Sequence, residues 1–181
     1  MNARRLSQAI AEGDGISIVV EVDSAEAARA AEDSRAEAVI ADGNSLPVIR
    51  AATSLPIICR GDRRLDGADA WIVQASLLGE RELEPGLEWI VEVRKEDELE
   101  AALETLDPEI FLLSPEQSNG QSAIERVLEL LPDVPAGKLA IADIDARTRE
   151  EVEELERAGV DGVIVAAGNV AHLVGAAPPE V

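Results

Sequence analysis

Short apolar runs rich in valine, isoleucine and alanine recur along the whole chain, and each is followed by a turn and a polar segment with helical spacing. The runs predict eight strands, at residues 16–22, 36–42, 55–60, 69–74, 88–93, 109–114, 138–143 and 161–167. Apolar residues at helical spacing predict the clearest helices over 24–34, 95–106, 121–131 and 148–159. The pattern is therefore a strand followed by a helix, repeated.

The helix predicted at 148–159 has the best-marked ends. Thr148 stands at the N-cap position, and Glu151 follows three residues later, as in a capping box. Gly159 stands where a helix commonly ends in a left-handed residue. These residues fix both boundaries.

Eight such units in one chain predict a closed (β/α)8 barrel, the TIM barrel. Continuous apolar strands indicate a parallel sheet that is covered on both faces. At 181 residues the barrel is minimal, because barrels of this kind typically run to about 250 residues. We expect one domain, with an N-terminal helix or arm over 1–15, the barrel over 16–175 and a tail over 176–181.

The connections between strands predict short βα loops and a reduced third helix. Only "GDRRLDGA" separates the third and fourth strands, which leaves room for one helical turn or none. A missing helix predicts an exposed wall at these strands, and a second copy of the chain is one way to cover it. The sequence leaves open a monomer or a homodimer.

Composition excludes some partners and indicates a compartment. The chain has 37 acidic and 16 basic residues, a formal charge of -21, and its field repels nucleic acid and anionic membrane surfaces. No segment is apolar for long enough to span a membrane, and the N-terminus lacks the apolar region of a leader. The single cysteine, Cys59, lies inside an apolar run, so we expect a buried thiol in a cytoplasmic protein.

Three segments resemble one family. They are "SLPIICRGD" (54–62), "LEWIVEVRKEDELEAAL" (87–103) and "ARTREEVEELERAGVDGVIV" (146–165). They are similar, in the same order, to the SLP-[apolar]2-RKDF, LVEVH-[acidic]3-LE-x-AL and IRT-x-EDV-x-L-x-x-AGADAVLVG segments of the indole-3-glycerol phosphate synthases of tryptophan biosynthesis. The chain resembles a shortened and divergent member of that family.

The resemblance implies a carboxy-lyase that closes an indole ring on a small phosphorylated metabolite, without a cofactor or metal. That chemistry uses a cationic general acid, a carboxylate base and a phosphate-binding end of the last two strands. The family's catalytic glutamates correspond to Glu21 and Glu92, and its general-acid lysine corresponds to Arg60. Ser114, Gly168 and Asn169 are the implied substrate-binding residues.

Several positions depart from the family. A guanidinium stays protonated at any working pH, so Arg60 can bind an anion but gives up a proton poorly. The remaining departures are Asp23 for a strand-one lysine, Leu113 for a strand-six asparagine, Ile144 and Asp145 for a Ser-Gly pair, and Ala166 and Ala167 for a Gly-Glu pair. The family's loop after strand one is also missing.

Strand alternation gives an expectation independent of the family. It places Glu21 with Asp23, Ile58 with Arg60, and Ile90 with Glu92 and Arg94 on common faces. If these faces line the barrel, its mouth gathers these carboxylates and Asp143 or Asp145, with Arg60 and Arg94 as counter-ions. Such a mouth is acidic and opposes a substrate that carries both phosphate and carboxylate.

Three functions remain open at this point, and so does the question whether the protein is an enzyme. The first is a barrel of this family with lost or very weak synthase activity, in which Glu21, Arg60 and Glu92 form an inherited ion-pair cluster. The second is an active synthase, with Glu92 as base, Glu21 orienting and Arg60 as electrostatic stabiliser. The third is a cation-dependent enzyme that uses the acidic mouth, although no ligand spacing marks a metal site. His172, Trp71 and Trp89 are interpreted as packing residues.

Overall fold

The structure, a computed structural model, describes residues 4–61, 66–80, 87–116 and 120–173. They form eight parallel strands that close into a barrel in chain order, each strand paired with the next and β8 paired with β1. This confirms the minimal (β/α)8 barrel. The strands are β1 (Ser17–Glu21), β2 (Ala38–Asp42), β3 (Ile57–Arg60), β4 (Ala70–Gln74), β5 (Glu88–Val93), β6 (Ile110–Leu113), β7 (Leu139–Ala142) and β8 (Gly162–Ala166).

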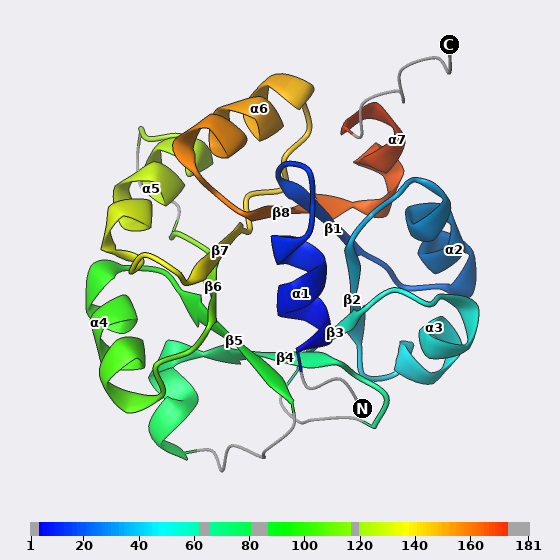
Figure 1. Ribbon diagram of the computed structural model, residues 1–181, viewed down its shortest axis with the longest axis horizontal. Helices are drawn as coiled ribbons and strands as arrows, with labels where there is room; N and C mark the ends of the chain where they lie inside the picture. Colours follow the sequence, from blue (N-terminus) through cyan, green and yellow to red (C-terminus); the bar gives the residue numbers. More distant parts are fainter. Residues whose placement is uncertain (1–3, 62–65, 81–86, 117–119, 174–181) are drawn as a thin grey trace.

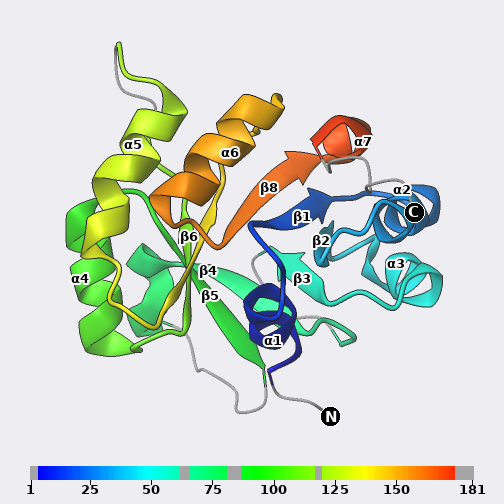
Figure 2. The ribbon, with the colours of Figure 1, turned by 45° about the horizontal axis from the view of Figure 1, so that its top comes forward.

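Helices surround the barrel and cover the outward faces of its strands (Figure 1). The outer helices are α2 (Ala25–Asp33), α3 (Leu46–Ala52), α4 (Glu96–Thr105), α5 (Ala123–Leu130) and α6 (Arg149–Ala158). Shorter elements complete the ring: the 3₁₀ helices η1 (Ala75–Glu80), η2 (Leu131–Asp133) and η3 (Ala167–Asn169), and α7 (Val170–Leu173). The turned view shows α5 beside α6 and α2 beside α3 (Figure 2).

The helix ends follow the sequence signals. In α6, the Thr148 side chain accepts from the Glu151 backbone N–H and the Glu151 carboxylate accepts from Thr148, while Gly159 ends the helix at φ 95°. A second capping box, with Ser122 and Glu125, begins α5. Each box satisfies donors that the first helical turn leaves unpaired.

The wall between β3 and β4 differs from the expectation in one respect. No helix occurs in the described residues between these strands, namely 61 and 66–69, as the short connection predicted. The wall is nevertheless not exposed: Cys59 is 0% and Trp71 7% exposed. Trp71 packs against Trp89 with ring centroids 5.2 Å apart, and its indole N–H donates to the Gly61 carbonyl at 2.9 Å. The outward side chains of the wall are therefore buried, and the expected exposed patch is wrong.

The inside of the barrel is a packed apolar core. Its inward residues come from every strand, and two more come from the N-terminal helix α1 (Arg5–Ala11). They are Leu6, Ile10, Val19, Ala38, Ile40, Ile58, Ala70, Ile72, Ile90, Ile110, Leu112, Ile141 and Ile164. Because Leu6 and Ile10 belong to this core, α1 closes the end of the barrel at which the strands begin, and Figure 1 shows it crossing the barrel's centre.

Side chains from the barrel hold α1 in that position. The Glu88 carboxylate, at the start of β5, accepts from the backbone N–H groups of Leu6 at 2.6 Å and Ser7 at 2.9 Å. Arg5 pairs with Asp69, just before β4, at 3.3 Å. The helix has no side-chain cap of its own, so the carboxylate of Glu88 supplies it. None of the described helices is long and apolar enough to cross a membrane.

Candidate functional site

The opposite end of the barrel, where the strands end, collects polar side chains. Alternation from the inward core residues continues to the last position of each strand or the next residue beyond it. The side chains placed there are Glu21 after Val19, Asp42 after Ile40, Arg60 after Ile58, Gln74 after Ile72, Glu92 after Ile90, Ser114 after Leu112, Asp143 after Ile141 and Ala166 after Ile164. Functional residues of such barrels come from this face, which we call the mouth.

Arg60 forms the central ion pair of the mouth. Its Nη2 donates to Asp143 Oδ2 at 2.9 Å, and the Ser114 hydroxyl donates to the same oxygen at 3.4 Å. The Arg60 side chain is 38% exposed and that of Asp143 is 20% exposed. Arg60 Nε is buried and has no hydrogen-bond partner. The guanidinium is therefore held by one carboxylate while one of its donors stays unused.

Glu92 forms a second, looser pair. Its carboxylate lies 3.6 Å from Nη2 of Arg94, which directly follows the end of β5. The Glu92 side chain is only 11% exposed, whereas that of Arg94 is 41% exposed. A carboxylate so little exposed needs a counter-ion, and Arg94 supplies one from the solvent side.

Two cavities open on either side of Arg60. The first, the acidic cavity, measures about 380 Å³ and is lined by Glu21, Val22, Asp23, Ile40, Asp42, Arg60 and Ala167. The second, the β4–β5 cavity, measures about 300 Å³ and is lined by Arg60, Gly61, Ile72, Val73, Gln74, Leu77, Glu92 and Arg94. Among the described lining residues, the acidic cavity has three carboxylates and one cation, and the β4–β5 cavity has two cations and one carboxylate.

Asp42 also organises the loop that follows β2. Its Oδ1 accepts from the Ser45 hydroxyl at 2.7 Å and from the backbone N–H groups of Ser45 and Asn44. The hydrogen bond from the Ser45 hydroxyl is the largest cause that lowers the pKa of Asp42 below its usual value. Asp42 therefore stays ionised at the mouth to a lower pH than an ordinary aspartate.

The structure thus brings several of the sequence candidates together. Glu21 and Arg60 line one cavity, Arg60 and Glu92 line the other, and Ser114 contacts the Arg60 partner Asp143. Gly168 and Asn169 lie in η3, directly after Ala167, which lines the acidic cavity. They are near the mouth without being among the residues that line either cavity.

Sequence reasoning missed Asp42 and Gln74. Each is the last residue of its strand and falls two positions after an inward isoleucine, so the alternation used for Glu21 would have found both. Of the two aspartates expected at the mouth, Asp143 and Asp145, the structure places Asp143 there, bonded to Arg60. Asp145 instead bonds to Arg147 at 2.8 Å on the surface. His172, expected to pack against the barrel, is exposed on α7, so that expectation is wrong.

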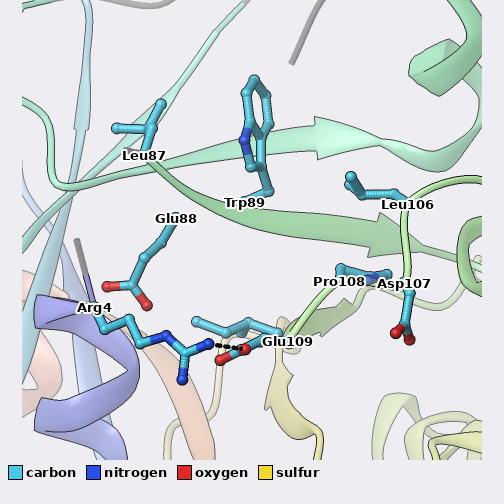
Figure 3. Close-up of a pocket in the computed structure, with 9 residues that line it drawn as sticks. Arg4, Leu87, Glu88, Trp89, Leu106, Asp107, Pro108 and Glu109 are labelled. Carbon is cyan, nitrogen blue, oxygen red and sulfur yellow. Dashed lines mark hydrogen bonds and ion pairs between the residues drawn. The ribbon is translucent and has the colours of Figure 1, made fainter. Parts of the chain in front are cut away.

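A further cavity lies at the other end of the barrel, beside α1 (Figure 3). It measures about 240 Å³ and has an apolar wall that includes Leu87, Trp89 and Pro108. Its three carboxylates are already engaged, because Glu88 caps α1, Asp107 pairs with Lys138 at 2.9 Å and Glu109 pairs with Arg4 at 2.6 Å. In the described parts of the chain, no three histidine, cysteine or carboxylate side chains are grouped so that they could hold a metal ion.

The fold and the mouth define a minimal TIM barrel whose mouth is acidic and contains ion pairs. Comparison with known proteins agrees with the sequence resemblance. Three curated relatives are named indole-3-glycerol phosphate synthase. That of Variovorax paradoxus is 29% identical over 88% of this chain and 64% of its own length. That of Alkaliphilus metalliredigens is 27% identical over 71% and 56%, and that of Acidithiobacillus ferrooxidans is 30% identical over 66% and 49%. The resemblance is confirmed: the chain is a divergent homologue of proteins with this name.

Coverage and two further comparisons show how far this homology extends. The matched regions span about half to two thirds of the length of these relatives. No family profile matches the chain. Among solved structures, an N-acetylmannosamine-6-phosphate 2-epimerase from Clostridium perfringens superposes with a TM-score of 0.65 at 16% identity, over 84% of this chain and 87% of that one. That likeness concerns the fold.

Proposed function

We propose that this chain is a barrel of indole-3-glycerol phosphate synthase ancestry whose synthase activity is lost or very weak, and whose mouth now binds a small ligand. The observation that carries the proposal is the state of Arg60. In the position of the family's general-acid lysine stands a guanidinium, and its Nη2 is bonded to Asp143 at 2.9 Å.

Acid catalysis is the first function that this arrangement opposes. A general acid works best when its pKa lies near the working pH, so that it can give up a proton and take it back. A guanidinium stays protonated at any working pH. Arg60 is therefore suited to binding an anion and poorly suited to protonating a substrate.

Charge is the second obstacle to the synthase reaction. The acidic cavity brings Glu21, Asp23 and Asp42 to the side of the mouth next to β8, where the family binds phosphate. One pair of like charges about 4 Å apart costs roughly 4 kcal/mol at an effective dielectric constant near 20. A phosphorylated substrate would meet several such charges, and Arg60 is the one cation among the described residues that line this cavity.

The second candidate is an active synthase, and the burial of Glu92 favours it. This carboxylate is only 11% exposed at the end of β5 and lies in the same cavity as Arg60. In this alternative Glu92 is the base, Glu21 orients the substrate and Arg60 stabilises developing negative charge. Gly168, Asn169 and Ser114 would then contact the substrate. The third candidate, a cation-dependent enzyme, has no supporting group of ligands in the described residues.

A direct assay of indole-3-glycerol phosphate formation tests the proposal. The purified chain is compared with Arg60→Lys and Glu92→Gln variants, and with Arg147→Lys as a control at the same end of the barrel and outside both cavities. We expect no turnover, or turnover near the detection limit, in the unmodified chain. Clear turnover that disappears in Glu92→Gln would overturn the proposal and establish the active synthase.

The Arg60→Lys variant divides the remaining outcomes. Activity that appears only in this variant would show that the single change at Arg60 silenced an otherwise working site. Inactivity of all the variants would indicate that phosphate binding has been lost as well, as the charge of the acidic cavity predicts.

Compartment and organisation are part of the same proposal. We expect a cytoplasmic protein, because the single cysteine, Cys59, is a buried free thiol and cannot form an internal disulfide. We also expect residues 16–175 to act as one barrel domain, with 1–15 and 176–181 as its extensions. The oligomeric state, monomer or homodimer, is decided by sedimentation at high concentration.

A further inference from the structure

The cavity beside α1, at the end of the barrel opposite the mouth, combines an apolar wall with a charged rim. We call it the basal cavity, and it measures about 240 Å³. The apolar wall is formed by Leu87, Trp89, Leu106, Pro108 and Ile110, and the rim by Arg4, Glu88, Asp107 and Glu109. Figure 3 shows the ion pair of Arg4 and Glu109 on the side of the cavity away from Trp89.

Two large apolar side chains of the wall are only partly covered by the protein. Trp89 and Leu106 pack against the core and remain partly buried, whereas Leu87 and Ile110 are 9% and 1% exposed. Apolar surface inside a concave site gains free energy when a hydrocarbon body removes it from water. An aromatic ring suits this wall, because rings pack favourably beside an indole in edge-to-face or offset arrangements.

The rim of the basal cavity favours a positive group. Its described residues include three carboxylates and one cation, Arg4. Asp107 is neutralised by Lys138 at 2.9 Å. Glu88, in contrast, accepts from backbone N–H groups of α1, which carry no net charge, and pairs with no cation in the described part of the chain. The charge of Glu88 therefore stays available to attract a cation that enters the cavity.

Arg4 is the rim residue that a ligand can displace most easily. Its Nη2 lies 2.6 Å from Oε1 of Glu109, but the two side chains are 72% and 52% exposed. Exposed ion pairs contribute little to stability, because solvent screens the charges and the long side chain loses freedom when it is held. A ligand ammonium that is anchored by an apolar body can therefore take the place of the guanidinium beside Glu109.

We propose that the basal cavity binds a small aromatic primary amine. The ring lies against Trp89 and Leu106, and the ammonium lies at the rim with Glu88 and Glu109. The cavity is smaller than the roughly 300–1,000 Å³ of common ligand sites, so it suits a body of one ring. This inference is independent of the proposed function, because the basal cavity shares no described lining residue with the two cavities of the mouth.

Charge decides between this ligand and its close analogues. An anionic analogue meets the unneutralised carboxylate of Glu88 at the rim and a net charge of -21 on the whole chain. A neutral analogue keeps the contact with the apolar wall and loses the attraction of the rim. The ammonium form gains from both features and should bind most tightly.

Calorimetric titration of the full chain with three probes tests the proposal. Phenethylamine supplies the ring and a positive charge, phenethyl alcohol the same ring without charge, and hydrocinnamate the same ring with a negative charge. At pH 7.5 the amine is protonated, since alkyl ammonium groups have a pKa of about 10. All titrations use one fixed ionic strength, because salt screens the field of the acidic chain.

The expected order of affinity is phenethylamine above both phenethyl alcohol and hydrocinnamate. Glu109→Gln should weaken phenethylamine binding by roughly two- to fivefold, the usual size for an exposed ion pair. Arg4→Gln should strengthen it by a similar factor, because it removes the competing cation. Both residues are more than half exposed, so neither variant endangers folding.

The ion pair of Arg149 and Glu153 on α6 provides matched controls. Its atoms are 2.9 Å apart, its side chains are 60% and 49% exposed, and neither residue lines the basal cavity. Glu153→Gln and Arg149→Gln change the net charge as the two test variants do. Phenethylamine affinity should therefore be the same in both controls as in the unmodified chain.

Nuclear magnetic resonance shows where the amine binds. The chain has two tryptophans and therefore two indole N–H signals. Trp89 lines the basal cavity and Trp71 does not, so phenethylamine should move the Trp89 signal further. A Trp71→Phe variant assigns the two signals.

Four results would overturn the inference. They are the absence of phenethylamine binding up to about 10 mM probe, binding of phenethyl alcohol or hydrocinnamate at least as tight as that of phenethylamine, equal phenethylamine affinity in Glu109→Gln and Glu153→Gln, and a Trp89 signal that stays in place while the amine binds.

Discussion

Replacing Glu88 with alanine should loosen α1 from the end of the barrel that it closes. The two carboxylate oxygens accept from the Leu6 and Ser7 backbone N–H groups at 2.6 and 2.9 Å, the second and third positions of a helix without a cap of its own. Loss of a helix cap costs about 0.5–2 kcal/mol, and loss of a negative charge at the helix start costs about 0.3–1 kcal/mol more. We expect a total of about 2 kcal/mol.

Urea unfolding and amide hydrogen exchange measure this effect in two independent ways. Urea unfolding should show a loss of about 2 kcal/mol in the free energy of unfolding. In a thermal melt the same loss would lower Tm by roughly 4–8 °C for a chain of this size. The Leu6 and Ser7 amides should exchange faster in Glu88→Ala, and Glu88→Gln, which keeps one acceptor oxygen, should lie in between. A matched control is Glu109→Ala, which removes a carboxylate from the same cavity.

The control isolates the capping role of Glu88. Among the residues that the structure describes, Glu109 pairs with Arg4 alone. The two side chains are 52% and 72% exposed, so solvent screens the pair and its loss should be within about 0.5 kcal/mol. Equal stability losses in Glu88→Ala and Glu109→Ala would refute the reasoning. So would unchanged exchange at Leu6 and Ser7, because capping acts on those two amides.

Three further outcomes are expected. Leu6→Ala should lower the free energy of unfolding in urea by about 3 kcal/mol, because the side chain is fully buried. The control Val48→Ala, on the exposed face of α3, should lower it by under about 0.5 kcal/mol. Similar losses in the two variants would contradict the placement of α1. Burial raises the pKa of Glu37 above its usual value, so its ionisation opposes folding as pH rises through the raised pKa. Thermal scans from pH 4.5 to 7 should show Glu37→Gln gaining on the unmodified chain, and a constant difference would contradict this. Raising KCl from 0.05 to 1 M should raise Tm, since a charge of -21 repels itself and salt screens it; a falling Tm would count against net repulsion.

The strands were predictable because their signals are local. Each apolar run is bounded by a turn, and the boundaries predicted for β5, residues 88–93, coincide with those observed. The capping residues of α6 act within four positions of each other, so the sequence alone identified them. The mouth followed from the same regularity, since a side chain two positions beyond an inward isoleucine also points inward.

Contacts between distant positions were not predictable in this way. The bond from Leu6 N–H to Glu88 joins residues 82 positions apart, and no local pattern marks Glu88 as a cap. Arg60 and Asp143 are 83 positions apart, so only the closed barrel reveals that the guanidinium has a partner. The contact between Trp71 and Trp89 joins two neighbouring strands, β4 and β5, and no local pattern in the sequence predicted that this pair would help to bury the wall where the helix is missing.

The seam between β1 and β8 has a consequence for biosynthesis. The first strand pairs in register with the last, from Ser17 opposite Gly162 to Glu21 opposite Ala166. During translation β1 leaves the ribosome early, and its partner follows only after most of the chain has been made, on the order of ten seconds later at typical rates. Until then one edge of β1 has unpaired backbone groups, which can template aggregation. Ribosome-bound chains that stop short of β8 are thus the stage at which this small barrel most needs a chaperone.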